Sequence, residues 1–361
     1  MQRNLLYSLF LIFSLSLCRV CSLAETTSGN PAEDVFGKNF VLTVDPTSGT
    51  LSYNFSSINK QLESIIATKD VRLVSDKMDL RCDRFTFDMN LRKIQATGKP
   101  IKIIQGPIDA LCGEFSYDPS TGRSELLYSP EIINRDPIGQ EISTKGDKMI
   151  IEKQKNGDTM VMVEGKARLS SKISKDNQTS PPPSPDPSRK VPGLDLSIVT
   201  GEKGEILYTF TGKNELRSIV ARNDVSISSQ EVELTCARLE YESETKKMIA
   251  SGKPVKIVQK NILAECGRLE YYPDEGKYLL LEDPSIINNN EEGVTMQTRG
   301  EKIFILQAKE GLTSVLVEGH PQIIGESGKK EDIAKKQTKE PPFPVDESRV
   351  NQIKNPDIIQ E

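Results

Sequence analysis

Tryptophan is absent from this sequence, histidine occurs once, and aromatic residues make up only 6% of the chain. Because His320 is the only histidine, the sequence offers neither a Ser-His-Asp set nor a histidine-rich metal site. It also contains no glycine-rich phosphate-binding loop. These absences argue against an enzyme, and we expect no catalytic residue, no bound metal and no cofactor.

Long apolar runs are scarce as well, and the one that stands out lies at the N-terminus. Arg3 precedes the apolar stretch Leu5–Leu17, and the small residues of Ser22-Leu23-Ala24 follow, as in a cleaved signal peptide. We therefore expect residues 1–24 to be removed and the mature protein to lie in the periplasm. A membrane anchor is one alternative, but the run is shorter than the roughly 20 residues that a spanning helix needs. Lipid attachment at Cys18 or Cys21 is the other, although neither cysteine follows a small residue.

Positive charge is not in excess. The chain carries 47 basic and 52 acidic residues, a formal net charge of −5, and loss of the signal peptide would make it more negative. Nucleic-acid-binding domains show the opposite balance, so we expect no nucleic-acid partner. A length of 361 residues leaves room for two domains at about 150 residues each.

The dominant feature is a long internal repeat, which has to be recognised before any motif is weighed. Residues 67–165 align without a gap with residues 221–319, and about two fifths of the aligned positions are identical. A Pro-rich polar segment follows each copy and cannot build a core. The sequence thus predicts these boundaries: module 1 over 38–171, a linker over 172–192, module 2 over 193–326 and a disordered polar tail over 327–361. The tail is interpreted as a relic of the copied linker or as a partner-binding peptide.

Alternation of apolar and polar residues predicts strands rather than helices. Met78, Leu80 and Cys82 are apolar at every second position, and the parity then changes to Phe85 and Phe87. A strand cannot change its buried face without a bulge or corner, because its side-chain period is two. The change recurs with a period of about 30 residues, each period being read as two short strands and a turn. The sequence predicts an all-β fold of two tandem modules, each a stacked-rung jelly roll or β-solenoid.

Four cysteines follow the predicted signal peptide, two in each copy and equally spaced. We expect Cys82–Cys112 and Cys236–Cys266 disulfides for two reasons. Equivalent positions in successive rungs would lie on neighbouring strands about 4.8 Å apart, which is within reach of a disulfide. An exported chain also enters an oxidising compartment. The alternative is that all four are buried thiols that pack as small apolar residues.

Several repeated motifs carry a resemblance to a known family. In the first copy they are Asp83–Asp88, Ala96–Ile103, Gly146–Ile150 and the closing Val163–Gly165; in the second copy they are Arg238–Tyr241, Ala250–Ile257 and Gly300–Ile303. Together they resemble the repeats of the lipopolysaccharide-transport protein A family, also called OstA-like. The resemblance covers nearly the whole chain outside the signal peptide and the Pro-rich segments.

The resemblance implies a periplasmic β-jelly roll whose apolar interior holds lipid acyl chains and whose sheet edges stack on other transport-bridge proteins. The expected ligand is lipopolysaccharide or another envelope lipid. This chain departs from the usual member in its two modules, its long spacer and its cysteine pairs, and the spacer argues against one continuous groove. Candidate groove residues are Phe85, Phe87, Ile101, Ile103, Phe115, Leu239, Tyr241, Val255 and Ile257.

The same residue types would also serve as plain core, so two functions remain open from the sequence. One is lipid binding for lipopolysaccharide transport and outer-membrane assembly; the other is a structural or adhesive envelope protein that uses the stacked sheet as a spacer. Four lysines beside the repeated Gly-Lys-Pro motifs are interpreted either as contacts for lipid phosphates or as solvated surface groups: Lys99, Lys102, Lys253 and Lys256.

Overall fold

The computed structural model describes residues 39–57, 61–76, 78–135, 140–173, 196–212, 216–229, 232–289, 294–307 and 313–327. The expected signal peptide and nearly all of the expected linker and tail lie outside these residues. Within the described part the only helical element is a 3-10 turn, η3 (Pro273–Glu275), and everything else that is regular is β-strand. The all-β prediction is therefore confirmed. No helix in this part is long and apolar enough to span a membrane.

The strands occur in two series. The first series is β1 (Phe40–Thr43), β2 (Thr50–Phe55), β3 (Leu62–Ser75), β4 (Asp79–Asp88), β5 (Lys93–Gln105), β6 (Ile108–Asp118), β7 (Arg123–Leu127), β8 (Glu131–Arg135), β9 (Gln140–Lys145), β10 (Lys148–Lys153), β11 (Thr159–Glu164) and β12 (Arg168–Ile173). The second is β13 (Leu196–Val199), β14 (Glu205–Phe210), β15 (Leu216–Ser228), β16 (Glu233–Glu242), β17 (Lys247–Gln259), β18 (Ile262–Tyr272), β19 (Lys277–Leu281), β20 (Ser285–Asn289), β21 (Val294–Arg299), β22 (Lys302–Gln307), β23 (Thr313–Glu318) and β24 (Gln322–Ser327).

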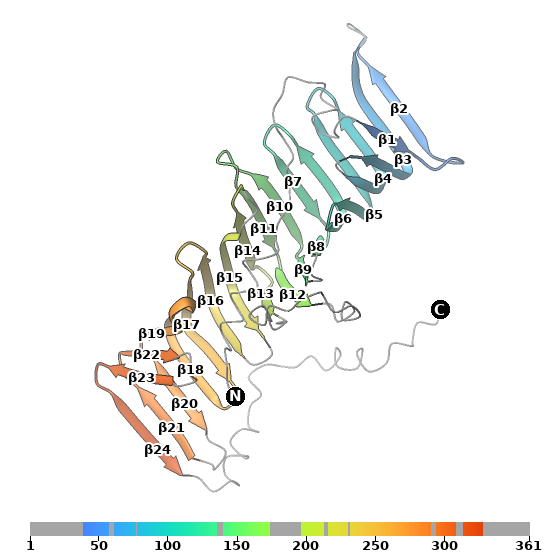
Figure 1. Ribbon diagram of the computed structural model, residues 1–361. Helices are drawn as coiled ribbons and strands as arrows, with labels where there is room; N and C mark the ends of the chain where they lie inside the picture. The colour runs from blue at the N-terminus through green and yellow to red at the C-terminus, as the bar shows by residue number, and fades with distance from the viewer. Residues whose placement is uncertain are drawn as a thin grey trace, which may run out of the picture.

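The second series repeats the first element by element. From β4 and β16 onward, each pair of equivalent strands has bounds separated by the offset of the sequence repeat. All strands pair antiparallel and stack one after another along the molecule, from β1 and β2 at one end to β23 and β24 at the other (Figure 1). The stacked rungs that the sequence predicts are present.

The strands form two facing sheets joined by bent strands. The eight long strands, β3 to β6 and β15 to β18, run through both sheets, and each short strand belongs to one. We call the sheet that contains β2, β7, β10, β11, β14, β19, β22 and β23 the first sheet. The second sheet contains β1, β8, β9, β12, β13, β20, β21 and β24.

The bend in each long strand explains the change of parity in the sequence. The pairing register shifts between Arg81 and Arg84 where β4 meets β5, which is where the apolar positions change from Cys82 to Phe85. The predicted corner is therefore confirmed. The prediction of two short strands per period was wrong, because each period is two long strands with the corner inside them. Likewise Gly98-Lys99-Pro100 is not a turn between strands but lies within β5 at its corner.

The two halves of the chain are joined by continuous strand pairing. In the first sheet β11 pairs with β14, and in the second sheet β12 pairs with β13. The spacer therefore does not interrupt the stack, contrary to the expectation from its length, and buried apolar residues of both halves form one cluster. Lys172 and Ile173 belong to β12 rather than to the linker. The division into two separate modules stays a prediction.

Candidate functional site: the apolar interior

The interior between the sheets is lined by rows of side chains that follow the strand register. Because alternate residues of a strand point to opposite faces, paired residues of one parity form a row across the whole stack. The central row of the first sheet is apolar at every position. In order it consists of Leu51, Ala67, Phe85, Ala96, Phe115, Leu126, Met149, Val163, Ile206, Ala221, Leu239, Ala250, Leu269, Leu280, Ile303 and Val317.

A row of the second sheet faces this one and also runs the length of the stack. It consists of Leu42, Leu73, Leu80, Ile103, Ala110, Ile132, Thr144, Leu169, Ile198, Ile227, Leu234, Ile257, Ala264, Ile286, Thr298 and Ile323. Thr144 and Thr298 are its only polar members. Tyr208, which belongs to a neighbouring row of the first sheet, is 3.3 Å from Thr144 between the Oη and Oγ1 atoms. This hydrogen bond links the two sheets close to where the halves meet.

The structure brings all nine candidate groove residues together on this interior. Six of them are buried within the core: Phe85, Phe87, Ile101, Phe115, Leu239 and Val255. Ile103, Tyr241 and Ile257 are half-buried and pack against it. Only these three therefore have side-chain surface that a ligand could reach without separating the sheets.

The expected disulfides are absent, and that prediction was wrong. All four cysteines are free thiols. Cys82 lies on β4 and Cys112 on β6, and β5 runs between them with Ile101 directly opposite Cys112. Equivalent positions of successive periods are thus two strands apart, about 9.6 Å, which exceeds the roughly 7 Å limit between the Cα atoms of a disulfide. The arrangement in the second half is the same, with Val255 opposite Cys266.

Burial keeps these thiols protonated. It raises the pKa of Cys82, Cys112 and Cys236 to about 12 and that of Cys266 to about 11. Because the thiolate is the reactive and metal-binding form, the four side chains act as small apolar core residues. Among the described residues no group of three or more potential metal ligands comes together.

Three lysines near the Gly-Lys-Pro motifs, Lys99, Lys102 and Lys256, do not line the interior. Lys99 and Lys102 are exposed, and Lys102 directly precedes the inward-facing Ile103, so the two side chains point to opposite faces of β5. Lys256 is half-buried, and its Nζ atom is 3.9 Å from the carboxylate of Glu265. The side chain of Lys253 lies outside the described part of the structure. A lipid phosphate at Lys99, Lys102 or Lys256 would therefore sit on the outer surface.

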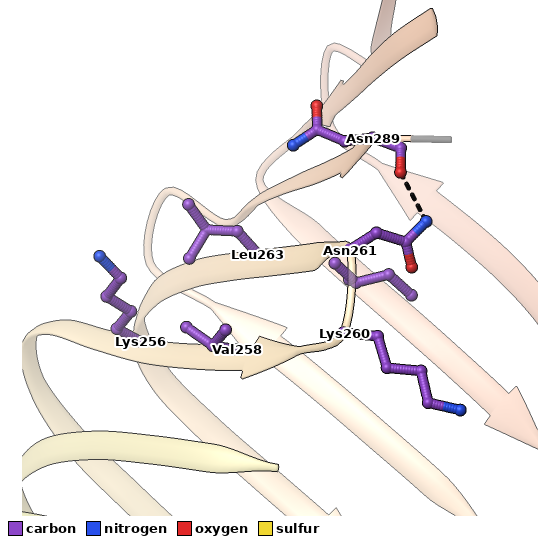
Figure 2. Close-up of a pocket in the computed structure, with 7 residues that line it drawn as sticks. Lys256, Val258, Lys260, Asn261, Leu263 and Asn289 are labelled. Carbon is purple, nitrogen blue, oxygen red and sulfur yellow. Dashed lines mark hydrogen bonds between the residues drawn. The ribbon is translucent and has the colours of Figure 1, made fainter. Parts of the chain in front are cut away.

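A shallow open pocket of about 380 Å³ lies at the hairpin between β17 and β18 (Figure 2). Its walls are the apolar Val258, Ile262 and Leu263 together with Lys256, Lys260, Asn261 and Asn289. The Nδ2 atom of Asn261 donates a 2.6 Å hydrogen bond to the backbone oxygen of Asn289.

The first half has an ion pair at the equivalent place. Asp109 and Arg135, which correspond to Leu263 and Asn289, are 2.7 Å apart. The pocket opens on the outer face and is not part of the interior, since Val258 and Leu263 have the parity opposite to that of Ile257.

Both ends of the stack expose interior positions that are buried where the halves meet. Tyr53 of β2 is 51% exposed, whereas Tyr208, its equivalent in β14, is 6% exposed. Leu169 of β12 is 5% exposed, whereas Ile323, its equivalent in β24, is 68% exposed. The two residues of each pair occupy equivalent positions in the two copies of the repeat. They differ in exposure because one has a further strand stacked beyond it and the other, in the described part of the chain, does not. The sequence analysis did not single out these exposed residues at the ends of the stack. For the β2 end a signal was present, since Leu51, Tyr53 and Phe55 are apolar at every second position.

Comparison with known proteins adds little. No protein-family model matches the sequence, and no curated protein matches it. Among solved structures it is similar to the crystal structure of LptH from Pseudomonas aeruginosa, titled as the LptA-homologous periplasmic component of the conserved lipopolysaccharide transport device. The identity is 19%, the alignment covers 40% of this chain and 91% of LptH, and the TM-score is 0.25. At this identity and TM-score the likeness supports no statement about function.

Proposed function

We propose that this chain is a non-enzymatic periplasmic protein that holds the acyl chains of lipopolysaccharide, or of another envelope lipid, along its apolar interior. The central row from Leu51 to Val317 carries this proposal, because it is apolar in every rung and crosses the meeting point of the two halves. Burial of an acyl chain yields about 0.8 kcal/mol per CH₂ group, so a long continuous apolar surface suits such a ligand.

The first contacts with lipid are made at the margin of this interior. Ile103 and Ile257 occupy equivalent, half-buried positions of the second sheet, and Tyr241 is half-buried on the first. An acyl chain that reaches the fully buried Phe85 or Leu239 has to displace packed side chains and move the sheets apart. Lipid uptake in this proposal is therefore accompanied by opening of the stack.

Site-specific photo-crosslinking tests the proposal. A photoreactive amino acid at Ile103 or Ile257 should form adducts with lipopolysaccharide added to the purified protein. The matched controls are Lys102 and Lys256, which are neighbours in sequence but point to the outer face. Equal labelling at inward and outward positions, or no labelling at any of them in folded protein, would contradict lipid binding in the interior.

A structural or adhesive spacer is the second candidate, and two observations favour it. Six of the nine candidate groove residues are already buried by protein, and the Tyr208–Thr144 hydrogen bond ties the two sheets together. A packed interior of this kind stiffens the stack without any ligand. If folded protein captures neither lipopolysaccharide nor phospholipid, this function replaces the first.

Edge-to-edge stacking with other β-proteins is part of either proposal. The β11–β14 pairing places Val161 opposite Tyr208 and Val163 opposite Ile206. At the two ends of the stack, β23 and β2 carry the equivalent residues. Val315 and Tyr53 are exposed there, and the described structure has no further strand beyond them. The pairing where the halves meet is thus a template for contacts with a transport-bridge partner or a further copy.

A further inference from the structure

The outer edge of β24 is an apolar edge with no strand beside it in the described part of the chain. β24 pairs with β21 through one edge only. Ile323 and Ile324 point to opposite faces and are both exposed. The strand reads Gln-Ile-Ile-Gly-Glu-Ser, with no lysine or proline of the kind that commonly protects a sheet edge. Such an edge is a template for a further strand.

The first half of the chain shows how this edge is covered. β12 is the equivalent of β24, and β13 pairs with it so that Ile198 lies opposite Leu169. β13 follows the Pro-rich segment of residues 178–189 in the sequence. The covering strand thus comes from the chain that leaves the edge strand itself, after a Pro-rich connection.

The sequence after β24 repeats this order. Residues 337–349 form a second Pro-rich segment that resembles residues 178–189. Asp357-Ile358-Ile359-Gln360 then takes the place of Ser197-Ile198-Val199-Thr200. The segment from Ser327 to Ile358 is longer than the segment from Ile173 to Ile198, so it is long enough to return to the edge in the same way.

We propose that residues 357–360 pair with β24 as β13 pairs with β12, so that the C-terminal tail covers this edge. The register of the first half places Ile358 opposite Ile323, Ile359 opposite Gln322 and Asp357 opposite Ile324. Pro356 then precedes the pairing residues, a position at which a strand tolerates proline. Ile358 faces the interior and covers Ile323.

If the tail pairs with β24, it competes with any incoming strand from another protein for the same edge. The tail strand would occupy the β24 edge, while the β23 edge of the first sheet has no strand beside it among the described residues. Under this proposal, a β-module that docks on both edges has to displace the tail first. The inference goes beyond lipid capture and does not depend on it.

Cysteine crosslinking in the full chain tests the register. The Ile323→Cys/Ile358→Cys variant should form a disulfide within one chain under mild oxidation, detected by mass spectrometry of non-reduced peptides. Leu169→Cys/Ile198→Cys is the positive control, because this pair is directly opposed in the structure. Ile323→Cys/Gln352→Cys is the out-of-register control and should give little product. The four native thiols are buried, so the wild-type chain treated in the same way gives the background level of disulfide formation.

Each other outcome overturns the proposal. Equal yields for the Ile358 and Gln352 variants mean that the tail contacts the edge without register. A disulfide between two chains means that a second copy supplies the strand. No product, while the positive control forms, means that the edge stays uncovered.

Hydrogen exchange provides an independent readout. The backbone amides of residues 323–325 should exchange at least about tenfold faster once residues 348–361 are removed, because a lost strand partner exposes them to local opening. Unchanged exchange rates contradict the proposal. Loss of lipid labelling at Ile103 with an intact Ile323–Ile358 crosslink would reject the proposed function and leave the tail strand standing.

Discussion

Glu270 is a charged side chain that the fold holds in a largely buried position on the outer face of the first sheet. Lys247 Nζ is 2.8 Å from its carboxylate, Arg268 donates at 2.7 Å and the Tyr272 hydroxyl donates at 2.8 Å. Burial by itself would raise the pKa of Glu270, but hydrogen bonds from these three groups outweigh it and hold the pKa at about 2. The carboxylate is therefore stabilised by its partners rather than by water.

Replacing this carboxylate should lower stability in a pH-dependent way. The pKa is about 2 in the folded chain against an ordinary 4.5, so the charge stabilises the fold fully above pH 4.5 and progressively less as the pH falls towards 2. Because its cationic partners are partly solvated, we expect Glu270→Gln to cost about 1–2 kcal/mol at pH 7 and almost nothing near pH 2.

Urea denaturation at several pH values measures this difference. Glu265→Gln is the control, since its carboxylate has Lys256 at 3.9 Å and should change stability by less than about 0.5 kcal/mol. A cost that is constant between pH 7 and pH 2 would show that the carboxylate acts only through shape and neutral hydrogen bonding.

At the scale of the element, the corner of each long strand decides which residues reach the interior. β15 and β17 both change register at this point, between Arg222 and Val225 and between Ser251 and Val255. Gly252 sits at the β17 corner with φ of +145°, and a Cβ atom there would lie 2.7 Å from the backbone nitrogen of Ala237. The corner therefore requires glycine for both its backbone conformation and its close approach to β16.

Adding a methyl group at this corner should destabilise the second half. We expect Gly252→Ala to cost about 1–3 kcal/mol, because it combines a strained φ with a steric clash. Gly98→Ala should cost less, since its Cβ would be 3.0 Å from the nearest atom, the Asp83 nitrogen. Gly325→Ala, with no atom within 4 Å, is the control without effect. Thermal unfolding of the three variants ranks the costs, and equal costs at all three would contradict this account of the corner.

At the scale of the whole molecule, the stack is elongated and has two unlike ends (Figure 1). β1 and β2 form one end and β23 and β24 the other, and both expose apolar residues that are buried where the halves meet. A contact between unlike ends is heterologous, so it extends a chain of molecules rather than closing a symmetric dimer. The pairings of β11 with β14 in the first sheet and of β12 with β13 in the second show that both sheets can continue across such a contact.

Mixing two end variants should distinguish this mode of association from others. In chains lacking residues 357–361, Tyr53→Asp should disable the β2 end and Val315→Asp the β23 end, because a charge would be buried without a partner at the contact. Each variant alone should stay monomeric. An equimolar mixture should form dimers but nothing larger, as measured by sedimentation velocity. Dimers of a single variant, or long assemblies of the mixture, would rule out head-to-tail pairing.

The sequence by itself determined that the fold is built of strands, where these strands bend and which residues face inward, but not how long the strands are. The alternation of apolar and polar residues from Met78 to Phe87 follows from the two-residue side-chain period of a strand. The repeat then identifies the corresponding residues of the second half. The pattern therefore indicated inward-facing residues in each half, whereas the spacer argued against one continuous interior.

Only the tertiary structure decided which strands are neighbours, because pairing partners leave no local signal in one sequence. It placed β5 between Cys82 and Cys112 and so excluded their disulfide. It joined β11 to β14 across the spacer and made the interior continuous. It also left Ile323 exposed while burying Leu169, since the burial of a residue depends on what is stacked beyond it rather than on its own identity.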